Sequence, residues 1–333
     1  MRIHVQNHDG DPNGTITPAL WRDAFGGDGH HAVSFGSTEA AFRAAAPDME
    51  VLLVATRALG GLLPLRAPRL RLVSVTSAGV EMLAPFDWLP DGVALLNNSG
   101  AHAVKGGEYG LMALLMLANR LPAFAAAQRD GAWRPQPAAS IAGARLAIVG
   151  LGAIGGHVAT LARQLGMRVT GVRMRPAPHP DCVRVAGMDQ LDEVLADSEY
   201  LLLALPGGPA TSRLIDRRRL MLLPRGAGIV NIGRGTVIDQ DALCDLLDAG
   251  VLGGAVLDVF DREPLAPASR VWRTRCLLVT PHISGDDHAT YLADTVRILA
   301  QNLAACEAGE PMPNRIDPTT GLRGDRPPPI SRG

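Results

Sequence analysis

The sequence has few cysteines, almost no net charge and no long apolar run, and each shortage excludes a class of protein. Its 333 residues include four cysteines, which are Cys182, Cys244, Cys276 and Cys306. They are too scattered for a disulfide framework or for a CxxC metal or redox site. A formal net charge of −1 gives no general attraction to nucleic acid or to membrane surfaces. We therefore expect no metal ion, no nucleic acid and no membrane among the partners of the chain.

The sequence also lacks a segment that predicts membrane insertion or secretion. The longest apolar stretch, Gly110 to Ala118, is too short to span a bilayer, and Met1 to Asn7 lacks the apolar core of a signal peptide. Together with the scarcity of cysteine, this favours a cytoplasmic location in a reducing environment. There is no internal repeat, and the length is sufficient for two domains with separate cores.

The most specific local pattern is RLAIVGLGAIGGH, from Arg145 to His157. A short apolar strand precedes three glycines in G-x-G-x-x-G spacing, and an amphipathic helix and a second strand, Arg168 to Val172, follow them. In a chain with 37 glycines, three alone could form an ordinary turn, but this context is typical of a dinucleotide pyrophosphate held at a helix N-terminus. The predicted ligands in this turn are Gly150, Gly152, Ala153, Ile154 and Gly155.

Short apolar strands alternate with helical stretches on both sides of this turn. The alternation predicts an α/β protein with two doubly wound parallel sheets, a flavodoxin-like substrate domain and a Rossmann cofactor domain. We expect residues 1–100 and 288–318 to form the substrate domain and residues 101–287 to form the dinucleotide-binding domain. Residues 319–333 are expected to be a loose tail, and one long apolar helix is expected from Gly106 to Ala126.

Three polar residues each follow a predicted strand: Arg234 in NIGRG, Glu263 in LDVFDREPL and His282 in TPHISG. Taken singly, they could be a loop cation, a surface acid and a capping residue. Ligands of doubly wound sheets, however, bind at the carboxyl ends of the strands. An arginine fork can hold the carboxylate of a 2-keto acid, and a histidine beside a carboxylate can give a proton to the keto oxygen as hydride arrives. The three residues therefore predict a hydride-transfer site.

With these motifs the sequence resembles the D-isomer-specific 2-hydroxyacid dehydrogenases, and among them the glyoxylate/hydroxypyruvate reductase-like branch. The resemblance rests on GLGAIG, NIGRG, LDVFDREPL, TPHISG and NLAACEAGEPMPNRID, which occur in this order over most of the chain. It implies an oxidoreductase that reduces a small 2-keto acid to the D-2-hydroxy acid. In that reaction Arg234 binds the substrate, His282 is the acid/base and Glu263 is the partner of the histidine.

The resemblance implies further contacts. Ser77, Ala78 and Gly79, in TSAGVEML, match a substrate loop whose backbone amides bind the carboxylate, although a simple turn after a strand would read the same way. Asp258 would hold the nicotinamide carboxamide, and Ile232 is counted among the positions that contact the cofactor. A homodimer with the Gly106 to Ala126 helix in its interface is also implied. The sequence leaves the roles of Lys105 and His102 open.

The residues after the second strand bear on the choice of cofactor. Arg173 and Arg175 stand where an NAD-binding protein of this fold has an acid for the ribose hydroxyls, and no acid occurs before Asp181. Two guanidinium groups can pair with a 2′-phosphate, so we expect NADP(H) to be preferred, with NAD(H) possible. The alternative is that both arginines are exposed loop residues and NAD binds without its usual acidic partner.

Two other functions stay open at this level. Relatives of this family serve as dinucleotide-sensing corepressors that dimerise, and others oxidise a different small anion such as phosphite. The Thr76 to Glu81 loop has no lysine of the kind that would favour phosphite. The identity of the 2-keto acid cannot be predicted from these motifs.

Overall fold

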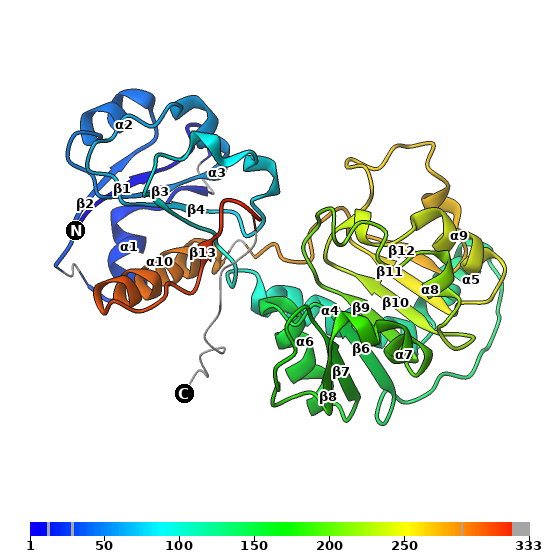
Figure 1. The fold of residues 1–333 in the computed structure, drawn as a ribbon. Coiled ribbons are helices and arrows are strands. Elements are labelled where there is room, and N and C mark those ends of the chain that lie inside the picture. Colours follow the sequence, from blue (N-terminus) through cyan, green and yellow to red (C-terminus); the bar gives the residue numbers. More distant parts are fainter. Residues whose placement is uncertain (12–13, 28–29, 288, 322–333) are drawn as a thin grey trace. The chain divides into compact units, whose positions relative to one another are not determined.

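The computed structural model describes residues 1–11, 14–27, 30–287 and 289–321. The chain divides into two compact units, one formed by Met1–His102 and the residues from Asp287 onward, the other by Ala103–Asp286 (Figure 1). The expected boundaries at 100/101 and 287/288 fall within two residues of these divisions. Most of the expected loose tail, from residue 322 on, lies outside the described residues.

The first unit contains a six-stranded sheet with the order β13-β5-β4-β3-β1-β2. Its strands are β1 (Arg2–Gln6), β2 (Ala32–Gly36), β3 (Val51–Val54), β4 (Leu72–Val75), β5 (Ala94–Leu96) and β13 (Arg315–Ile316). Strands β1 to β5 are parallel to one another, and β13 pairs antiparallel with β5. The order β2-β1-β3-β4-β5 is the flavodoxin-like one, which confirms the predicted fold class for this unit.

The helices of the first unit are α1 (Pro18–Phe25), α2 (Glu39–Ala45), the short α3 (Thr56–Leu59) and α10 (Tyr291–Glu307). Thr17 and Thr38 cap α1 and α2, each accepting a hydrogen bond from an amide of the first turn. Helix α10 follows the whole second unit in sequence, yet Val296, Leu299 and Leu303 are buried in the same core as strand β1. The end of the chain therefore completes the unit that its beginning starts.

The second unit contains a seven-stranded parallel sheet with the order β12-β11-β10-β9-β6-β7-β8. Its strands are β6 (Arg145–Val149), β7 (Arg168–Val172), β8 (Arg184–Ala186), β9 (Tyr200–Leu203), β10 (Gly228–Asn231), β11 (Gly254–Leu257) and β12 (Leu277–Val279). The order reverses between β6 and β9, as in a Rossmann fold, so both predicted sheet types are confirmed. The central strands are buried on both faces, which explains their continuous apolar sequences.

The helices of the second unit are α4 (Ala103–Ala118), α5 (Leu121–Arg129), α6 (Ala153–Gln164), α7 (Leu191–Ala196), α8 (Arg217–Leu220) and α9 (Gln240–Asp248). The single helix expected from Gly106 to Ala126 is wrong, because the chain bends by 66° between α4 and α5. Arg120 at the break has a left-handed φ of 54°, and Pro122 lies in the first turn of α5. Within the described residues, no helix taken singly has the length and apolarity to cross a bilayer, and only this bent pair passes such a test together.

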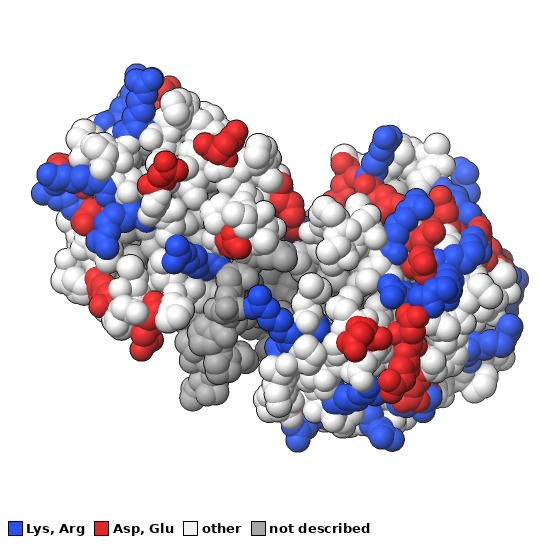
Figure 2. All heavy atoms as spheres, viewed as in Figure 1, with Lys and Arg blue, Asp and Glu red and all other residues white. Residues whose placement is uncertain are grey.

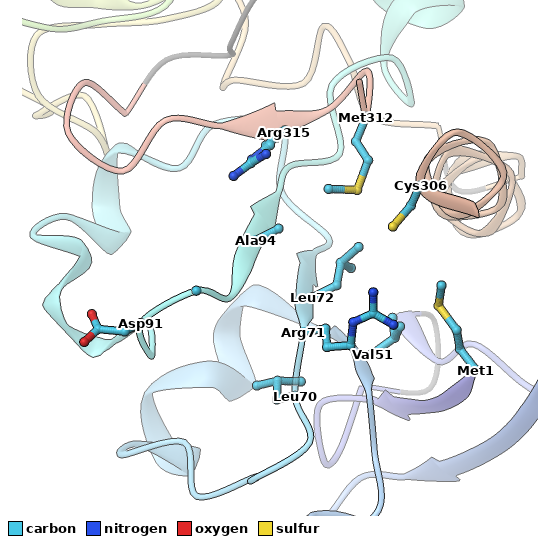
Figure 3. Close-up of a pocket in the computed structure, with 11 residues that line it drawn as sticks. Met1, Val51, Leu70, Arg71, Leu72, Asp91, Ala94, Cys306, Met312 and Arg315 are labelled. Atoms are coloured by element: carbon cyan, nitrogen blue, oxygen red, sulfur yellow. The ribbon is translucent and has the colours of Figure 1, made fainter. Parts of the chain in front are cut away.

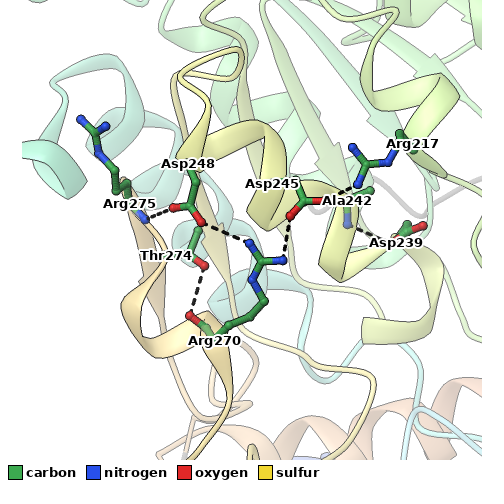
Figure 4. A network of polar contacts seen from close by, with 8 residues as sticks. All are labelled: Arg217, Asp239, Ala242, Asp245, Asp248, Arg270, Thr274 and Arg275. Carbon is green, nitrogen blue, oxygen red and sulfur yellow. Dashed lines mark hydrogen bonds and ion pairs between the residues drawn. The ribbon is translucent and has the colours of Figure 1, made fainter.

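An ion-pair network fixes the segment between β11 and β12, which carries Glu263. Arg270 in this segment donates to Asp245 at 2.7 Å and to Asp248 at 3.2 Å, both on α9 (Figure 4). Asp245 also pairs with Arg217 of α8, and Asp239 caps α9. Exposed pairs contribute little one by one, but a network that shares its carboxylates orders the segment.

The charges on the face drawn in Figure 2 are of both signs and intermixed over the surface of each unit. This distribution agrees with the formal net charge of −1. The basic run from Arg217 to Arg219 is also accompanied by acids: Arg217 pairs with Asp245, and Arg218 and Arg219 both pair with Asp192. Each arginine of the run thus has an acidic partner within the second unit.

Candidate active site

The glycine turn between β6 and α6 is shaped by close backbone approaches. Gly150 has a left-handed φ of 100°, and a Cβ there would lie 2.6 Å from the carbonyl oxygen of Ala204, which follows β9. A Cβ on Gly155 would lie 2.0 Å from the carbonyl oxygen of Gly150. Any side chain at these two positions would separate the helix from the sheet. Both glycines are therefore required by the fold itself.

Gly152 is different, because no protein atom demands a glycine there. Its φ of −78° is open to any residue, and a Cβ would meet nothing within 4 Å. Gly152 is also the N-cap of α6 and offers no side-chain cap, so the first amides of the helix, those of Ala153 and Ile154, are left for an anion. This open cradle fits the pyrophosphate of a dinucleotide.

Arg173 directly follows β7, at the carboxyl edge of the sheet. One of its terminal nitrogens donates to the carbonyl of Ala177, while its Nε is buried and has no hydrogen-bond partner in the part of the chain that the structure describes. An unpaired buried donor is unfavourable, so its position suits an anionic ligand. Arg175, two residues further on, is exposed.

His282 and Glu263 are in direct contact in the second unit. Nδ1 of His282 lies 2.6 Å from Oε2 of Glu263, and Oε1 of Glu263 accepts a hydrogen bond of 2.9 Å from the amide of Phe260. The glutamate is therefore held at both oxygens, and it fixes one edge of the imidazole. The side chain of His282 is 49% exposed, so its other nitrogen, Nε2, is accessible to a substrate.

The loop that carries His282 is anchored by the buried carboxylate of Asp258. Oδ1 of Asp258 accepts hydrogen bonds from the hydroxyl of Thr280 at 2.6 Å and the amide of Ile283 at 2.9 Å, and Oδ2 accepts from the amide of Ser284 at 2.9 Å. His282 itself has a left-handed φ of 57°, and its amide donates to the carbonyl of Asp258. This strained backbone persists because its neighbours are held on both sides.

A hydroxyl chain extends this anchor to helix α4. The hydroxyl of Tyr109 lies 2.5 Å from Oγ1 of Thr280. Thr280 has one proton, which it gives to Asp258, so Tyr109 must be the donor in its own contact. Burial raises the pKa of Tyr109, which keeps this phenol protonated. The sequence prediction assigned no role to either residue: Thr280 begins the TPHISG motif but was not singled out, and Tyr109 belongs to none of the motifs.

Arg234 lies at the same edge of the sheet as the histidine pair. Strands β10, β11 and β12 are parallel neighbours whose last residues, Asn231, Leu257 and Val279, are in register, and the three predicted catalytic residues each follow one of them. Asn231 holds the turn, because its side chain accepts from the amide of Gly233 and donates to the carbonyl of Arg234. The edge thus gathers all three candidates on consecutive strands.

Two predicted cofactor positions are buried. Asp258 is 0% exposed and its carboxylate already accepts three hydrogen bonds, so its observed role is to position the loop, and a contact with a carboxamide stays a prediction. Ile232 is 5% exposed, and its Cδ1 would lie 3.4 Å from a Cβ on Gly110 of α4. The side chain of Ile232 therefore belongs to the core.

The predicted substrate loop lies in the first unit, after β4. The amide of Ser77 already donates to Oγ1 of Thr56 at 3.0 Å. The prediction that all three amides bind a carboxylate is therefore narrowed to Ala78 and Gly79, whose amides have no acceptor among the described residues. The hydroxyl of Tyr291 in α10 donates to the carbonyl of Thr76. The ring of His102 stacks on the ring of Tyr291, with the two ring centroids 4.9 Å apart. This stacking gives His102 a structural position that the sequence could not assign.

A hollow in the first unit lies at the amino ends of its strands, whereas the predicted substrate loop lies at their carboxyl ends. It is lined by Met1, by residues at the amino ends of β3, β4 and β5, such as Val51, Leu72 and Ala94, and by Cys306 (Figure 3). The substrate loop follows the carboxyl end of β4, so this hollow is not the predicted substrate site.

Lys105, in the first turn of α4, is partly exposed.

Fold and site together define a two-domain nicotinamide-dinucleotide oxidoreductase. Residues 111–284, just over half of the chain, match the family model described as D-isomer specific 2-hydroxyacid dehydrogenase, NAD binding domain. The chain therefore belongs to the D-isomer specific 2-hydroxyacid dehydrogenase family. The predicted family resemblance is confirmed.

Individual relatives agree with this assignment. A glyoxylate reductase from Korarchaeum cryptofilum is 29% identical over 75% of this chain and 77% of that protein. A chloroplastic D-3-phosphoglycerate dehydrogenase from Arabidopsis thaliana is also 29% identical, over 73% of this chain, but the match spans only 39% of the plant protein. Among solved structures, a D-isomer specific 2-hydroxyacid dehydrogenase from Xanthobacter autotrophicus Py2, in complex with NADPH and MES, is 28% identical with a TM-score of 0.78, covering 96% of this chain and 99% of that one.

The hydroxyl chain generates a test of the anchor. We expect Thr280→Val to lower the free energy of unfolding by about 1–3 kcal/mol, because it leaves the Tyr109 hydroxyl and an oxygen of Asp258 short of a partner. We expect it also to lower kcat, since the loop of His282 loses one of its ties. Thr280→Ser keeps the hydroxyl and should behave like wild type. Chemical denaturation and steady-state kinetics measure both effects, and equal behaviour of the Val and Ser variants would contradict the anchor.

Proposed function

We propose that the chain is an NADPH-dependent reductase of small 2-keto acids of the glyoxylate and hydroxypyruvate type, with the D-2-hydroxy acid as product. The observation that carries the proposal is the 2.6 Å contact between His282 and Glu263, at the strand edge that also bears Arg234. The name of the archaeal relative, glyoxylate reductase, supports the substrate class.

The roles of the residues follow from their chemistry. Arg234 binds the carboxylate of the keto acid and polarises its keto group, because a guanidinium fork matches a planar carboxylate. Nε2 of His282 donates a proton to the keto oxygen as negative charge develops there, while Glu263 keeps the ring oriented through Nδ1. For the first unit taken by itself, the amides of Ala78 and Gly79 stay predicted as carboxylate ligands. The bound nicotinamide supplies the hydride.

The preference for NADPH is supported by the loop after β7. Arg173 presents a buried Nε without a hydrogen-bond partner among the described residues, Arg175 is nearby in sequence, and no acid occurs where an NAD-binding protein of this fold usually has one. A guanidinium pairs with a 2′-phosphate, whereas an acid would repel it. The Xanthobacter structure contains NADPH, which agrees with this choice.

We propose that the protein forms a homodimer through helices α4 and α5. Val104, Met112 and Leu115 of α4 are 42%, 39% and 36% exposed, and they lie at helical spacing on one face, which also carries the exposed Glu108. Leu121 at the start of α5 is 42% exposed. Apolar side chains gathered in this way are more typical of a covered surface than of a solvated one.

A reducing cytoplasm is likewise proposed. All four cysteines are free thiols, although Cys182, Cys276 and Cys306 are only partly buried. Burial raises the pKa of Cys182 to about 11, so this thiol stays protonated at neutral pH. Cys182 is therefore not proposed as a reactive thiol.

The central residues can be tested as a pair. We expect His282→Ala to lower kcat for hydroxypyruvate reduction about 10²–10⁴-fold, since it removes the proton donor. Glu263→Gln should lower kcat less, and the double variant should be no slower than His282→Ala, because Glu263 acts only through the histidine. Asp261→Asn, on the same loop, is the matched control and should be unaffected. Additive losses in the double variant would mean that the two side chains act separately.

The cofactor preference is tested by kcat/KM for NADPH and NADH. We expect wild type to prefer NADPH, and Arg173→Asp to lower kcat/KM for NADPH about 10–100-fold, because a charge-assisted hydrogen bond contributes roughly 1.5–3 kcal/mol. Arg168→Asp, at the other end of β7, is the matched control. A wild-type preference for NADH, or equal effects of the two substitutions, would remove Arg173 from phosphate recognition.

The dimer is tested by sedimentation at micromolar concentration. We expect wild type to sediment as a dimer and Leu115→Glu as a monomer, because a charge in an apolar interface is left without a partner. Met221→Glu, which changes an equally apolar side chain that is 63% exposed after α8, should remain dimeric. A monomeric wild type contradicts the proposal.

A further inference from the structure

Two adjacent histidines in the first unit meet a glutamate that is far away in sequence. His30 and His31 directly precede strand β2, and Glu307 is the last residue of α10. Nε2 of His30 lies 3.0 Å from Oε1 of Glu307, and Nε2 of His31 lies 3.9 Å from the same oxygen. The three ligand atoms all lie within 4.8 Å of one another. This cluster contains none of the residues assigned to hydride transfer.

The cluster has the composition and spacing of a transition-metal site. Two imidazoles and one carboxylate are a ligand set used by zinc, with a fourth position open to water. Ligand atoms about 2.0–2.2 Å from a tetrahedral ion stand roughly 3.3 Å apart. The two nitrogen–oxygen distances, 3.0 Å and 3.9 Å, lie on either side of this value.

His31 is already held in position without a metal. Its side chain is only 4% exposed, and its ring packs edge-on against Phe25 at 5.5 Å. Its Nδ1 lies 3.1 Å from the amino group of Met1, so binding of a metal by Nε2 requires the ring proton on Nδ1 and an amino group that has lost a proton and accepts from it. His30 is 72% exposed, which leaves the site open from solvent.

We propose that His30, His31 and Glu307 bind one divalent transition-metal ion of the zinc type. The ion would join the segment before the edge strand β2 to the end of α10, two parts of the first unit that are 277 residues apart. A ligand that binds only the folded state stabilises it, so the site would act as a structural clip. The absence of a metal-binding sequence pattern does not argue against it, because motif spacing detects only ligands that are close in sequence.

The experiment is a zinc titration of the tag-free, chelator-treated full chain by calorimetry. We expect one ion per chain, and at least about tenfold weaker binding for His30→Ala and for Glu307→Gln, since each removes a ligand. Glu310→Gln, an exposed acid three residues beyond Glu307, is the matched control and should bind as wild type does. Zinc should raise the melting temperature of wild type and of the control, but not of the His30→Ala, Glu307→Gln double variant.

Other groups in the chain could also bind zinc, and the variants distinguish binding there from binding at His30, His31 and Glu307. Both substituted side chains are exposed, so the variants are expected to fold, and their melting curves without zinc verify this. No binding by wild type would overturn the proposal. Binding that is unchanged in the double variant would overturn it as well, because the ion would then lie on cysteines or on His282 and Glu263. Reductase activity is not needed for any of these readouts.

Discussion

The carboxylate of Asp258 is the interaction on which the proposed active site depends most. It is fully buried and accepts hydrogen bonds from the Thr280 hydroxyl and from the amides of Ile283 and Ser284. These donors lie on both sides of His282, whose φ of 57° is unfavourable for a residue with a side chain. The buried charge thus holds the histidine where Glu263 can reach it. A buried carboxylate is itself tolerated only because its oxygens are supplied with donors.

Close backbone packing supplies the second constraint at this edge of the sheet. A Cβ on Gly235, beside Arg234, would lie 1.9 Å from the carbonyl carbon of Phe260, whose amide donates to Glu263. The turn that presents the arginine and the turn that presents the glutamate therefore touch through their backbones. This contact couples the positions of two predicted catalytic residues without any side-chain bond between them. It explains why NIGRG has a glycine after its arginine.

Sequence reasoning could identify the features that depend on local order. The glycine turn, the two sheet types and the positions of Arg234, Glu263 and His282 all follow from spacing relative to strands. The break at Arg120 was missed although the sequence carries a signal for it, because Asn119 and Arg120 interrupt the apolar run and Pro122 favours the start of a new helix. The Tyr109 and Thr280 hydroxyl chain joins residues 171 positions apart, and no local pattern specifies such a contact. The engagement of the Ser77 amide by Thr56 was missed for the same reason.

The central claim is that this edge of the second unit supports transfer of hydride to a small 2-keto acid. The most direct measurement is the oxidation of NADPH by the purified protein with hydroxypyruvate, combined with chiral analysis of the glycerate formed. The account predicts stoichiometric oxidation of NADPH and the D enantiomer as product. A protein that binds NADPH but oxidises it with neither glyoxylate, hydroxypyruvate nor pyruvate, or that forms the L enantiomer, would contradict the account.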